Sequence, residues 1–230
     1  MISIVGLGPG NSEYITEIAK LTLGNADVIY GYSRHMDIIK AIDTKAEKTE
    51  YLKLDELCTK ISYDLEKEDK ERQDKGSEVD ETADKTRNEI NISVLASGDP
   101  SLYGIAKYIN KKFGEKNEIR IIPGISSVQY LFAKISLPMN DVYITSSHGK
   151  DPDMDIIMNM KKIAMMTDTE KGPVYIADIF KDISDDPYII VGEMLGYDDE
   201  CITITKASEL DRKKDYKMSV VIIVKGELYE

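Results

Sequence analysis

Cysteine and histidine are scarce in this chain of 230 residues. It contains two cysteines, Cys58 and Cys201, with no Cys-x-x-Cys pair, and two histidines, His35 and His148. A disulfide framework or a structural zinc site needs more of these residues at short spacings, so the sequence argues against both. The few thiols suit a reducing compartment, and we expect a cytoplasmic protein that holds no metal.

The chain also lacks an excess of positive charge and any long apolar run. Its 42 acidic residues outnumber 30 basic ones, which gives a formal net charge of −12. A chain this acidic is not expected to bind nucleic acid or an anionic membrane surface. No stretch reaches the roughly 20 apolar residues of a membrane span, and the amino-terminal segment lacks the basic flank of a signal peptide.

The sequence does contain an alternation of short apolar strands and amphipathic helices, which predicts an α/β protein with two α/β domains, residues 1–116 and 117–230. Three strands near the carboxyl terminus follow one another with little helix between them, which favours an antiparallel or mixed sheet in the second domain. The predicted strands are 2–5, 26–30, 90–96, 119–122, 141–145, 173–179, 188–194, 201–205 and 218–224.

Helices are predicted between these strands. Asn11 or Ser12 is a suitable cap for the first, and the methionines of the last, Met154, Met158 and Met165, have the spacing of a core-facing stripe. The strongly charged segment 64–89 predicts a solvated helix followed by an exposed loop. Four predicted helices have the bounds 34–42, 101–113, 128–136 and 153–166, and the fourth contains the three methionines.

Three glycine-containing turns each follow a predicted strand. They are Gly6-Leu7-Gly8-Pro9-Gly10, Ser97-Gly98-Asp99-Pro100 and Pro123-Gly124-Ile125-Ser126-Ser127. The first lacks the third glycine of the dinucleotide fingerprint, because Asn11 stands there, and it lacks the Lys-Ser/Thr of a phosphate-binding loop. Alone, the first is equally consistent with a plain turn, and the other two with a helix cap. Together they suit the carboxyl edge of a sheet, where α/β proteins bind ligands.

Two further turns complete this predicted rim. Ser146-Ser147-His148-Gly149-Lys150 follows one strand and Gly192-Glu193-Met194-Leu195-Gly196 ends another. Neither has the spacing of a serine hydrolase triad, and no Gly-x-Ser-x-Gly occurs. A rim without a paired nucleophile and base favours close backbone contact with a ligand that brings its own reactivity.

These turns, in this order, resemble the tetrapyrrole methylase family, and the resemblance extends over essentially the whole chain. It implies the class III methyltransferase fold, with two α/β domains and S-adenosylmethionine bound in the cleft between them. The resemblance implies a homodimer that methylates a tetrapyrrole. The residues that would bind the methyl donor by position are Pro9, Gly98, Asp99, Leu102, Ser126, Ser127, Ala177 and Leu195.

Within the family, the sequence is similar to the CbiE-type subgroup, which methylates ring carbon 5 of cobalt-precorrin in cobalamin biosynthesis. The similarity rests on Gly31-Tyr32-Ser33-Arg34-His35, on residues 124–129, 146–150 and 193–200. The subgroup usually has arginine at the position of Lys150, and the acidic segment 64–89 is longer than its pattern. A separate CbiT-type methyltransferase and decarboxylase is implied as a partner.

The corrin intermediate carries several carboxylates, so a local basic rim is expected. We predict that Gly8, Arg34, His35 and Lys150 bind this substrate and that His148 acts as a proton acceptor. Relatives that methylate uroporphyrinogen carry an aspartate thought to be catalytic where this chain has Gly31, so that role does not transfer.

Two alternatives stay open at the level of the sequence. One keeps the fold but changes the substrate to another ring position, a protein or an RNA. The other is a non-catalytic donor-binding subunit, with the segment 64–89 as a partner surface.

Overall fold

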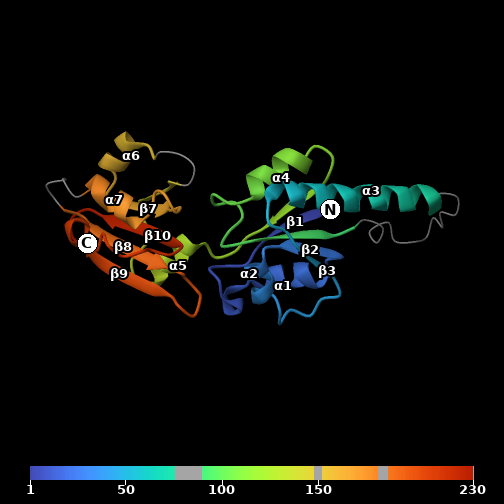
Figure 1. Ribbon diagram of the computed structural model, residues 1–230, viewed down its shortest axis with the longest axis horizontal. Helices are drawn as coiled ribbons and strands as arrows, with labels where there is room; N and C mark the ends of the chain where they lie inside the picture. The colour runs from blue at the N-terminus through green and yellow to red at the C-terminus, as the bar shows by residue number, and fades with distance from the viewer. Residues whose placement is uncertain (76–89, 148–151, 181–185, 230) are drawn as a thin grey trace. The chain divides into compact units, whose positions relative to one another are not determined.

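The computed structural model of the chain describes residues 1–75, 90–147, 152–180 and 186–229 (Figure 1). The chain divides into two compact units, Met1–Ile125 and Ser126–Glu230, each with a sheet of its own. The division falls later than the boundary expected after residue 116, because the strand Ile119–Ile122 pairs with the first strand of the chain.

The first unit contains a five-stranded sheet in the order β3-β2-β4-β1-β5, and every pair in it is parallel. The central strands β1 and β4 are buried along their whole length, as expected for a parallel sheet covered on both faces. The strands are β1 (Ile2–Gly6), β2 (Val28–Gly31), β3 (Glu47–Glu50), β4 (Ile92–Ala96) and β5 (Ile119–Ile122).

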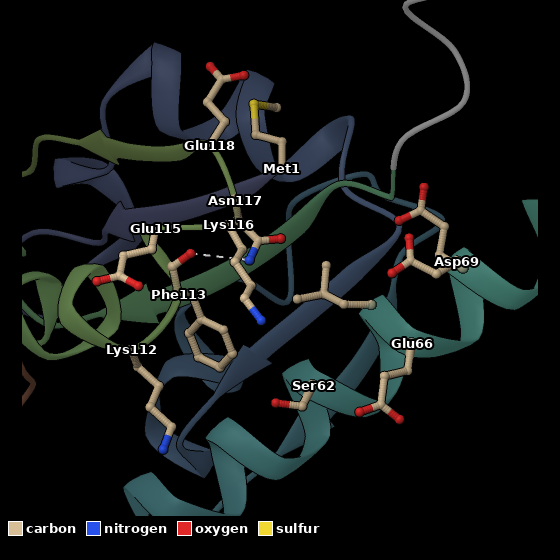
Figure 2. A pocket seen from close by; sticks show the side chains of 12 residues that line it. Met1, Ser62, Glu66, Asp69, Lys112, Phe113, Glu115, Lys116, Asn117 and Glu118 are labelled. Atoms are coloured by element: carbon tan, nitrogen blue, oxygen red, sulfur yellow. Dashed lines mark hydrogen bonds between the residues drawn. The ribbon is translucent and has the colours of Figure 1, made fainter.

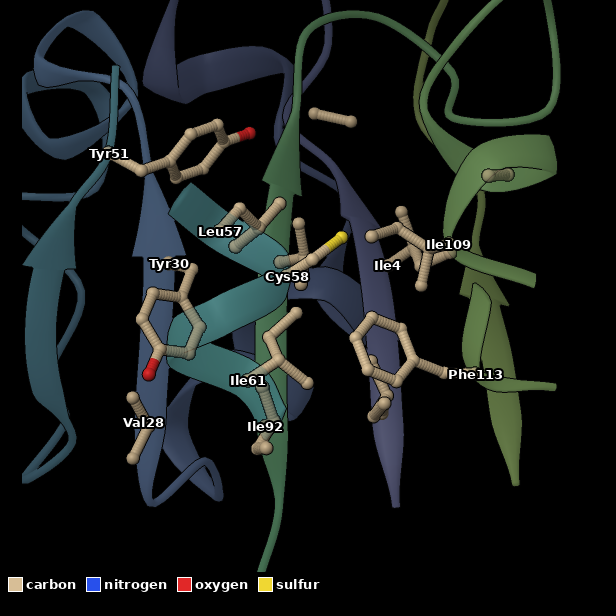
Figure 3. Close-up of a cluster of buried hydrophobic side chains, with 14 residues drawn as sticks. Ile4, Val28, Tyr30, Tyr51, Leu57, Cys58, Ile61, Ile92, Ile109 and Phe113 are labelled. Atoms are coloured by element: carbon tan, nitrogen blue, oxygen red, sulfur yellow. The ribbon is translucent and has the colours of Figure 1, made fainter. Parts of the chain in front are cut away.

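Helices cover both faces of this sheet (Figure 1). On one face, α3 (Leu54–Lys75) and α4 (Ala106–Phe113) pack Leu57, Ile61 and Phe113 against alternate residues of the strands (Figure 3). On the other face, α1 (Glu17–Gly24) and α2 (Ser33–Ile38) enclose a second core with the intervening strand residues. The period-2 alternation of the strands therefore supplies apolar side chains to both layers.

The predicted helix boundaries need two adjustments in this unit. Asn11 caps only a short 3-10 turn, η1 (Ser12–Tyr14), and Thr16 caps α1. The helix expected at 101–113 begins at Ala106, because turns occupy the preceding residues and Tyr103 has a positive φ of 52°. The sequence also did not predict β3, an exposed edge strand without an apolar pattern that is held by parallel backbone pairing with β2.

The second unit contains a mixed five-stranded sheet in the order β6-β7-β10-β8-β9. The pair β6–β7 is parallel and the other three pairs are antiparallel, which confirms the predicted mixed pairing. The strands are β6 (Val142–Ser146), β7 (Lys162–Met166), β8 (Tyr188–Glu193), β9 (Cys201–Lys206) and β10 (Ser219–Val224). The helices are α5 (Ser127–Lys134), α6 (Met154–Asn159) and α7 (Pro173–Phe180).

The strand predicted at 173–179 is wrong, because this segment forms the helix α7. Pro173 stands at its first position, where a proline fits a helix, and the buried residues Ile176, Ala177 and Phe180 follow at helical spacing. The same residues face a core shared with β7, β8 and β10.

The single helix predicted at 153–166 is also wrong. The segment forms α6, which ends at Asn159, and then the strand β7. Met165 is buried in the sheet, whereas Met158 is 43% exposed, so the methionines do not form one helical stripe. Both corrections have the same origin: short apolar runs suit either a buried helix or a buried strand, and the tertiary neighbours decide.

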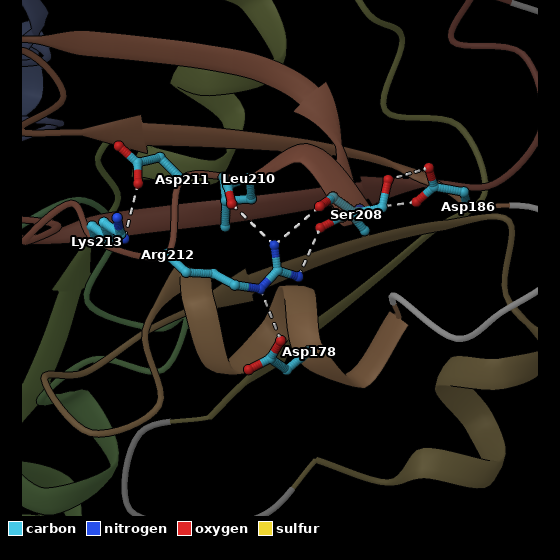
Figure 4. Close-up of polar contacts among 8 residues, drawn as sticks. Asp178, Asp186, Ser208, Leu210, Asp211, Arg212 and Lys213 are labelled. Atoms are coloured by element: carbon cyan, nitrogen blue, oxygen red, sulfur yellow. Dashed lines mark hydrogen bonds and ion pairs between the residues drawn. The ribbon is translucent and has the colours of Figure 1, made fainter.

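A hydrogen-bond network around Arg212, which is exposed, fixes the segment that follows β9 in the second unit. Arg212 donates to Asp178 Oδ1 of α7 at 3.1 Å and to the carbonyls of Ala207, Ser208 and Leu210 at 3.0–3.2 Å (Figure 4). The planar guanidinium thus joins the short 3-10 helix η3 (Ala207–Glu209) to α7. We assign Arg212 a structural role on this basis.

Candidate functional site

The turns after β1, β4 and β5 meet at one edge of the first sheet. These strands are neighbours and parallel, so their carboxyl ends must lie at the same edge. The first two turns are joined directly: Gly98 N donates to Gly8 O at 2.8 Å, and Gly8 N donates to Gly98 O at 3.3 Å. The structure therefore brings the first two glycine motifs of the sequence into contact.

The third turn packs against both of the others through glycine. A Cβ atom added at Gly124 would lie 2.2 Å from Gly98 O and 2.9 Å from the carbonyl carbon of Gly6. One added at Gly6 would lie 2.7 Å from Gly124 N and from Gly98 O. Only glycine allows backbones to approach this closely, so Gly6, Gly98 and Gly124 form a glycine junction between the three turns. Pro9 and Pro100, which are close to these glycines in the sequence, are both buried.

Asp99 shapes the turn that follows β4. Its Oδ1 accepts from Ser101 N at 2.8 Å and also from the Ser101 hydroxyl, which closes an Asx-type turn. Within the described residues Oδ2 makes no hydrogen bond, and the side chain is half-buried. Leu102 N donates to Asp99 O at 3.2 Å, and Leu102 is likewise half-buried. A structural role and a ligand-binding role of Asp99 are thus compatible, because Oδ1 closes the turn and Oδ2 is available to a ligand.

The start of α2 lies against the same turn. His35 Nε2 lies 2.9 Å from Ser97 Oγ, and Arg34 Nη2 donates to the same oxygen at 3.4 Å. The Arg34 guanidinium also lies 5.6 Å from the centre of the Tyr32 ring. Two predicted substrate-binding residues therefore converge on Ser97, a residue of the motif that the sequence did not single out as a ligand contact.

The expectation that His35 adds positive charge to a basic rim is corrected. Its side chain is 1% exposed. Burial, helped by the neighbouring Arg34 charge, lowers the pKa of His35 from 6.5 to about 4, so the ring is neutral near pH 7. Arg34, which is exposed, carries the charge in this pair.

Position 31 is tightly surrounded, and a side chain such as that of aspartate would contact its neighbours. A Cβ atom there would lie 2.8 Å from Leu95 Cδ1 and 3.2 Å from His35 Cβ. A side chain at position 31 would therefore require Leu95 or His35 to shift. The buried His35 and the small Gly31 thus belong to one packing arrangement.

Tyr51 is a further buried polar group at this edge that the sequence did not indicate. Its side chain, drawn in Figure 3, is 1% exposed. Its ring centre lies 4.5 Å from that of Tyr32. Within the described residues its hydroxyl oxygen has no hydrogen-bond partner of acceptable geometry. Burial and the neighbouring Tyr32 raise the pKa of Tyr51 above its ordinary value, so the hydroxyl stays protonated.

The predicted donor residues of the second unit have well-defined local roles. Ser126 caps α5: its Oγ accepts from Gln129 N at 3.1 Å, and Ser126 N donates to Gln129 Oε1 at 3.0 Å. Ser127, half-buried, is the first residue of that helix. Leu195 is 4% exposed and packs against Gly192.

Ala177 lies on α7 and not on a strand, and its side chain is fully buried in the core of the second unit. Its contact with a methyl donor stays a prediction. His148 and Lys150 lie outside the described residues, so their predicted roles are likewise untested. Ser147, just before them, is buried and donates to Lys171 O at 3.0 Å, which leaves it unsuited to nucleophilic attack.

A cavity of the first unit lies at the opposite, amino-terminal edge of its strands. It measures about 670 Å³, with Glu66 and Asp69 of α3 on one side and Lys112 and Lys116 on the other (Figure 2). A second cavity, of about 500 Å³, lies beside α1 and α2. Neither contains any of the predicted site residues, so the candidate site is the loop cluster around the glycine junction.

The described residues contain neither a metal-binding cluster nor a membrane-spanning helix. Among them, no group of three or more His, Cys, Asp or Glu side chains is arranged to hold a metal ion. No helix in this part of the chain is long and apolar enough to cross a membrane.

The glycine junction and its order along the chain agree with comparisons to known proteins. The family model of the tetrapyrrole (corrin/porphyrin) methylases matches residues 1–211. The chain belongs to this family. The class III methyltransferase fold predicted from its motifs is confirmed by solved structures of the same architecture.

Two relatives match this tetrapyrrole methylase along nearly its full length. It is 33% identical to the cobalt-precorrin-7 C(5)-methyltransferase of Salmonella typhimurium, over 97% of this chain and 98% of the relative. It is 28% identical to a probable cobalt-precorrin-7 C(5)-methyltransferase of Methanocaldococcus jannaschii, over 99% of each.

Solved structures with low sequence identity share the fold of this tetrapyrrole methylase. The precorrin-6Y methylase of Archaeoglobus fulgidus superposes with a TM-score of 0.63 at 23% identity, covering 99% of this chain and 98% of the other. The uroporphyrin-III C-methyltransferase of Thermus thermophilus, complexed with S-adenosyl homocysteine, has a TM-score of 0.72 at 17% identity and 97% coverage of both chains.

Proposed function

We propose that this tetrapyrrole methylase transfers a methyl group from S-adenosylmethionine to ring carbon 5 of cobalt-precorrin-7 in cobalamin biosynthesis. The observation that carries the proposal is the match along nearly the whole chain to relatives that bear this name. The glycine junction supports it, because three strand-end turns with closely packed backbones form a rigid base for a ligand.

The described residues of the first unit fit such a donor. S-adenosylmethionine supplies an activated methyl group on a positively charged sulfur. In the proposed site, Asp99 Oδ2 accepts a hydrogen bond from the donor, while Oδ1 keeps the turn closed through Ser101. Pro9, Gly98 and Leu102 line the same edge, and Ser126, Ser127, Ala177 and Leu195 are the proposed contributions of the second unit.

The protein's part in the reaction is to position the two reactants and to exclude water. Holding them in line lowers the barrier by up to roughly 7–11 kcal/mol in ideal cases. This explains a site without a nucleophile–base pair among the described residues. His148 remains the proposed proton acceptor, and Gly8, Arg34 and Lys150 remain proposed substrate contacts.

The partners are proposals of the same kind. We propose a homodimer in the cytoplasm and a separate CbiT-type methyltransferase and decarboxylase as a partner.

The test of the donor site is calorimetry with S-adenosylhomocysteine. The variant Asp99→Asn keeps an oxygen for the Ser101 bond but removes the charge, and we expect its Kd to rise about 10-fold, as for the loss of one charged hydrogen bond. Asp99→Ala also opens the turn and is expected to lose more.

The matched control is Asp69→Asn, an exposed aspartate at the amino-terminal edge, with an expected Kd within two-fold of wild type. Unchanged affinity in both Asp99 variants would remove Asp99 from the donor site. Turnover of cobalt-precorrin-7 with ¹³C-methyl donor, followed by NMR, then tests the position of methylation: a label on another carbon rejects the proposed ring position.

A further inference from the structure

The hydroxyl of Ser97 stands at the carboxyl end of β4, exposed, between two donors of α2. Its oxygen is 2.9 Å from His35 Nε2 and 3.4 Å from Arg34 Nη2. Arginine can only donate, so this contact occupies one lone pair of the oxygen.

The second contact is also a donation to Ser97. The backbone N–H of Tyr32 donates to His35 Nδ1 at 3.4 Å, so Nδ1 is the acceptor of the ring. The ring is buried and neutral, and in a neutral imidazole the other nitrogen then carries the proton. His35 Nε2–H therefore donates to Ser97 Oγ.

These two bonds leave the Ser97 hydroxyl with one unused function. A serine hydroxyl has two lone pairs and one proton, and both lone pairs are taken. Within the described residues no acceptor receives its proton. The remaining N–H groups of Arg34 also find no acceptor among these residues. The Ser97 hydroxyl and the positively charged Arg34 guanidinium are therefore neighbouring donors that are available to a ligand.

We infer that Ser97 is a substrate-binding residue: its hydroxyl, together with Arg34, donates a hydrogen bond to a carboxylate of the macrocycle. His35 is a positioning residue that orients this hydroxyl. The inference rests on the proposed function, which supplies a substrate with several carboxylates. A carboxylate is the matching partner because it only accepts and can receive both donors. The Ser97-Gly98-Asp99-Pro100 turn thereby serves both reactants: Ser97 the acceptor substrate, Asp99 the methyl donor.

The experiment compares kinetics with cobalt-precorrin-7 and binding of S-adenosylhomocysteine. For Ser97→Ala we expect the KM for cobalt-precorrin-7 to rise about 10-fold, with kcat and the Kd for S-adenosylhomocysteine within two-fold of wild type. Ser97→Thr keeps the hydroxyl and is expected to restore KM to within three-fold. Ser62→Ala, a serine at the amino-terminal cavity, is the control with wild-type kinetics.

The positioning role of His35 is tested by a double-mutant cycle. His35→Phe fills the buried space without the N–H and is expected to raise KM several-fold in the wild-type background. In the Ser97→Ala background it should have no further effect, because His35 acts through Ser97. An equal increase in both backgrounds overturns the positioning role.

The outcomes separate this inference from the proposed function. If the wild-type enzyme does not turn over cobalt-precorrin-7, the proposed function fails and the inference with it. If the wild-type enzyme is active and Ser97→Ala leaves KM unchanged, the inference alone fails. A parallel loss of S-adenosylhomocysteine affinity in Ser97→Ala also overturns it, because Ser97 would then act at the donor.

Discussion

At the scale of single residues, burial decides which chemistry each candidate can perform. His35 and Arg34 are adjacent in sequence and both were predicted to bind an anionic substrate. The structure buries the first and exposes the second, so one is a neutral hydrogen-bond donor and the other a cation. The sequence shows which residue types are present, whereas the fold buries His35 and leaves Arg34 exposed.

The depressed pKa of His35 predicts an acid-dependent loss of stability. In the unfolded chain the ring binds a proton near its usual pKa of 6.5, and in the folded chain only near 4. Its contribution is therefore complete above pH 6.5 and is lost as the pH falls toward 4, by roughly 3 kcal/mol in total. The charge that faces the ring is Arg34, which acts in the same direction.

Urea unfolding at pH 7 and pH 5 measures this effect. Between these values His35 should account for about 2 kcal/mol of the loss in unfolding free energy. The His35→Phe variant lacks this imidazole but keeps every other titratable group. Its decrease in unfolding free energy between pH 7 and pH 5 should therefore be smaller by that amount. Equal losses in both proteins would show that His35 titrates normally.

At the scale of elements, the glycine junction is the feature on which the candidate site depends. Gly124→Ala would place a Cβ atom 2.2 Å from Gly98 O, backbone against backbone, where no side chain can move aside. We expect a loss of about 3 kcal/mol in unfolding free energy, at the upper end for overpacking, and weaker binding of S-adenosylhomocysteine.

Gly24→Ala is the matched control for that variant. It lies at the end of α1, and the nearest atom to its added Cβ is Asp43 O at 3.6 Å, an ordinary contact. Alanine is the better helix former, so stability should be unchanged or slightly higher. Thermal unfolding measures the stability of the two variants, and calorimetry measures their affinity for S-adenosylhomocysteine. Equal stability and affinity of both variants would show that the close backbone contacts at Gly124 are not required.

At the scale of the whole molecule, the chain contains two sheets of different construction. Every pair in the first is parallel, and β1 is an interior strand of it, between β4 and β5; the second is mixed, with β10 in the middle. The strands β1 and β10 are buried at every position and paired on both sides. The edge strands β3 and β9 pair on one side only and contain exposed residues.

Hydrogen exchange followed by mass spectrometry is expected to reproduce this division in each unit. Amides of β1 and β10 should exchange slowest, because they open only with the sheet around them. Those of β3 and β9 should exchange much faster, since one neighbour protects them. Protection of β3 equal to that of β1 would show that the edge is covered in solution.

The sequence by itself determined the family, the α/β class and the loops of the candidate site, because these depend on short motifs at strand ends. It did not determine whether 162–166 and 173–180 are helix or strand, since a short apolar run is compatible with both until its neighbours are in place. Nor could it show that Ser97 receives two donors, because residues 34, 35 and 97 meet only when β2 and β4 pair. Local patterns are written in the chain, whereas burial and the direction of each hydrogen bond exist only after distant segments have packed together.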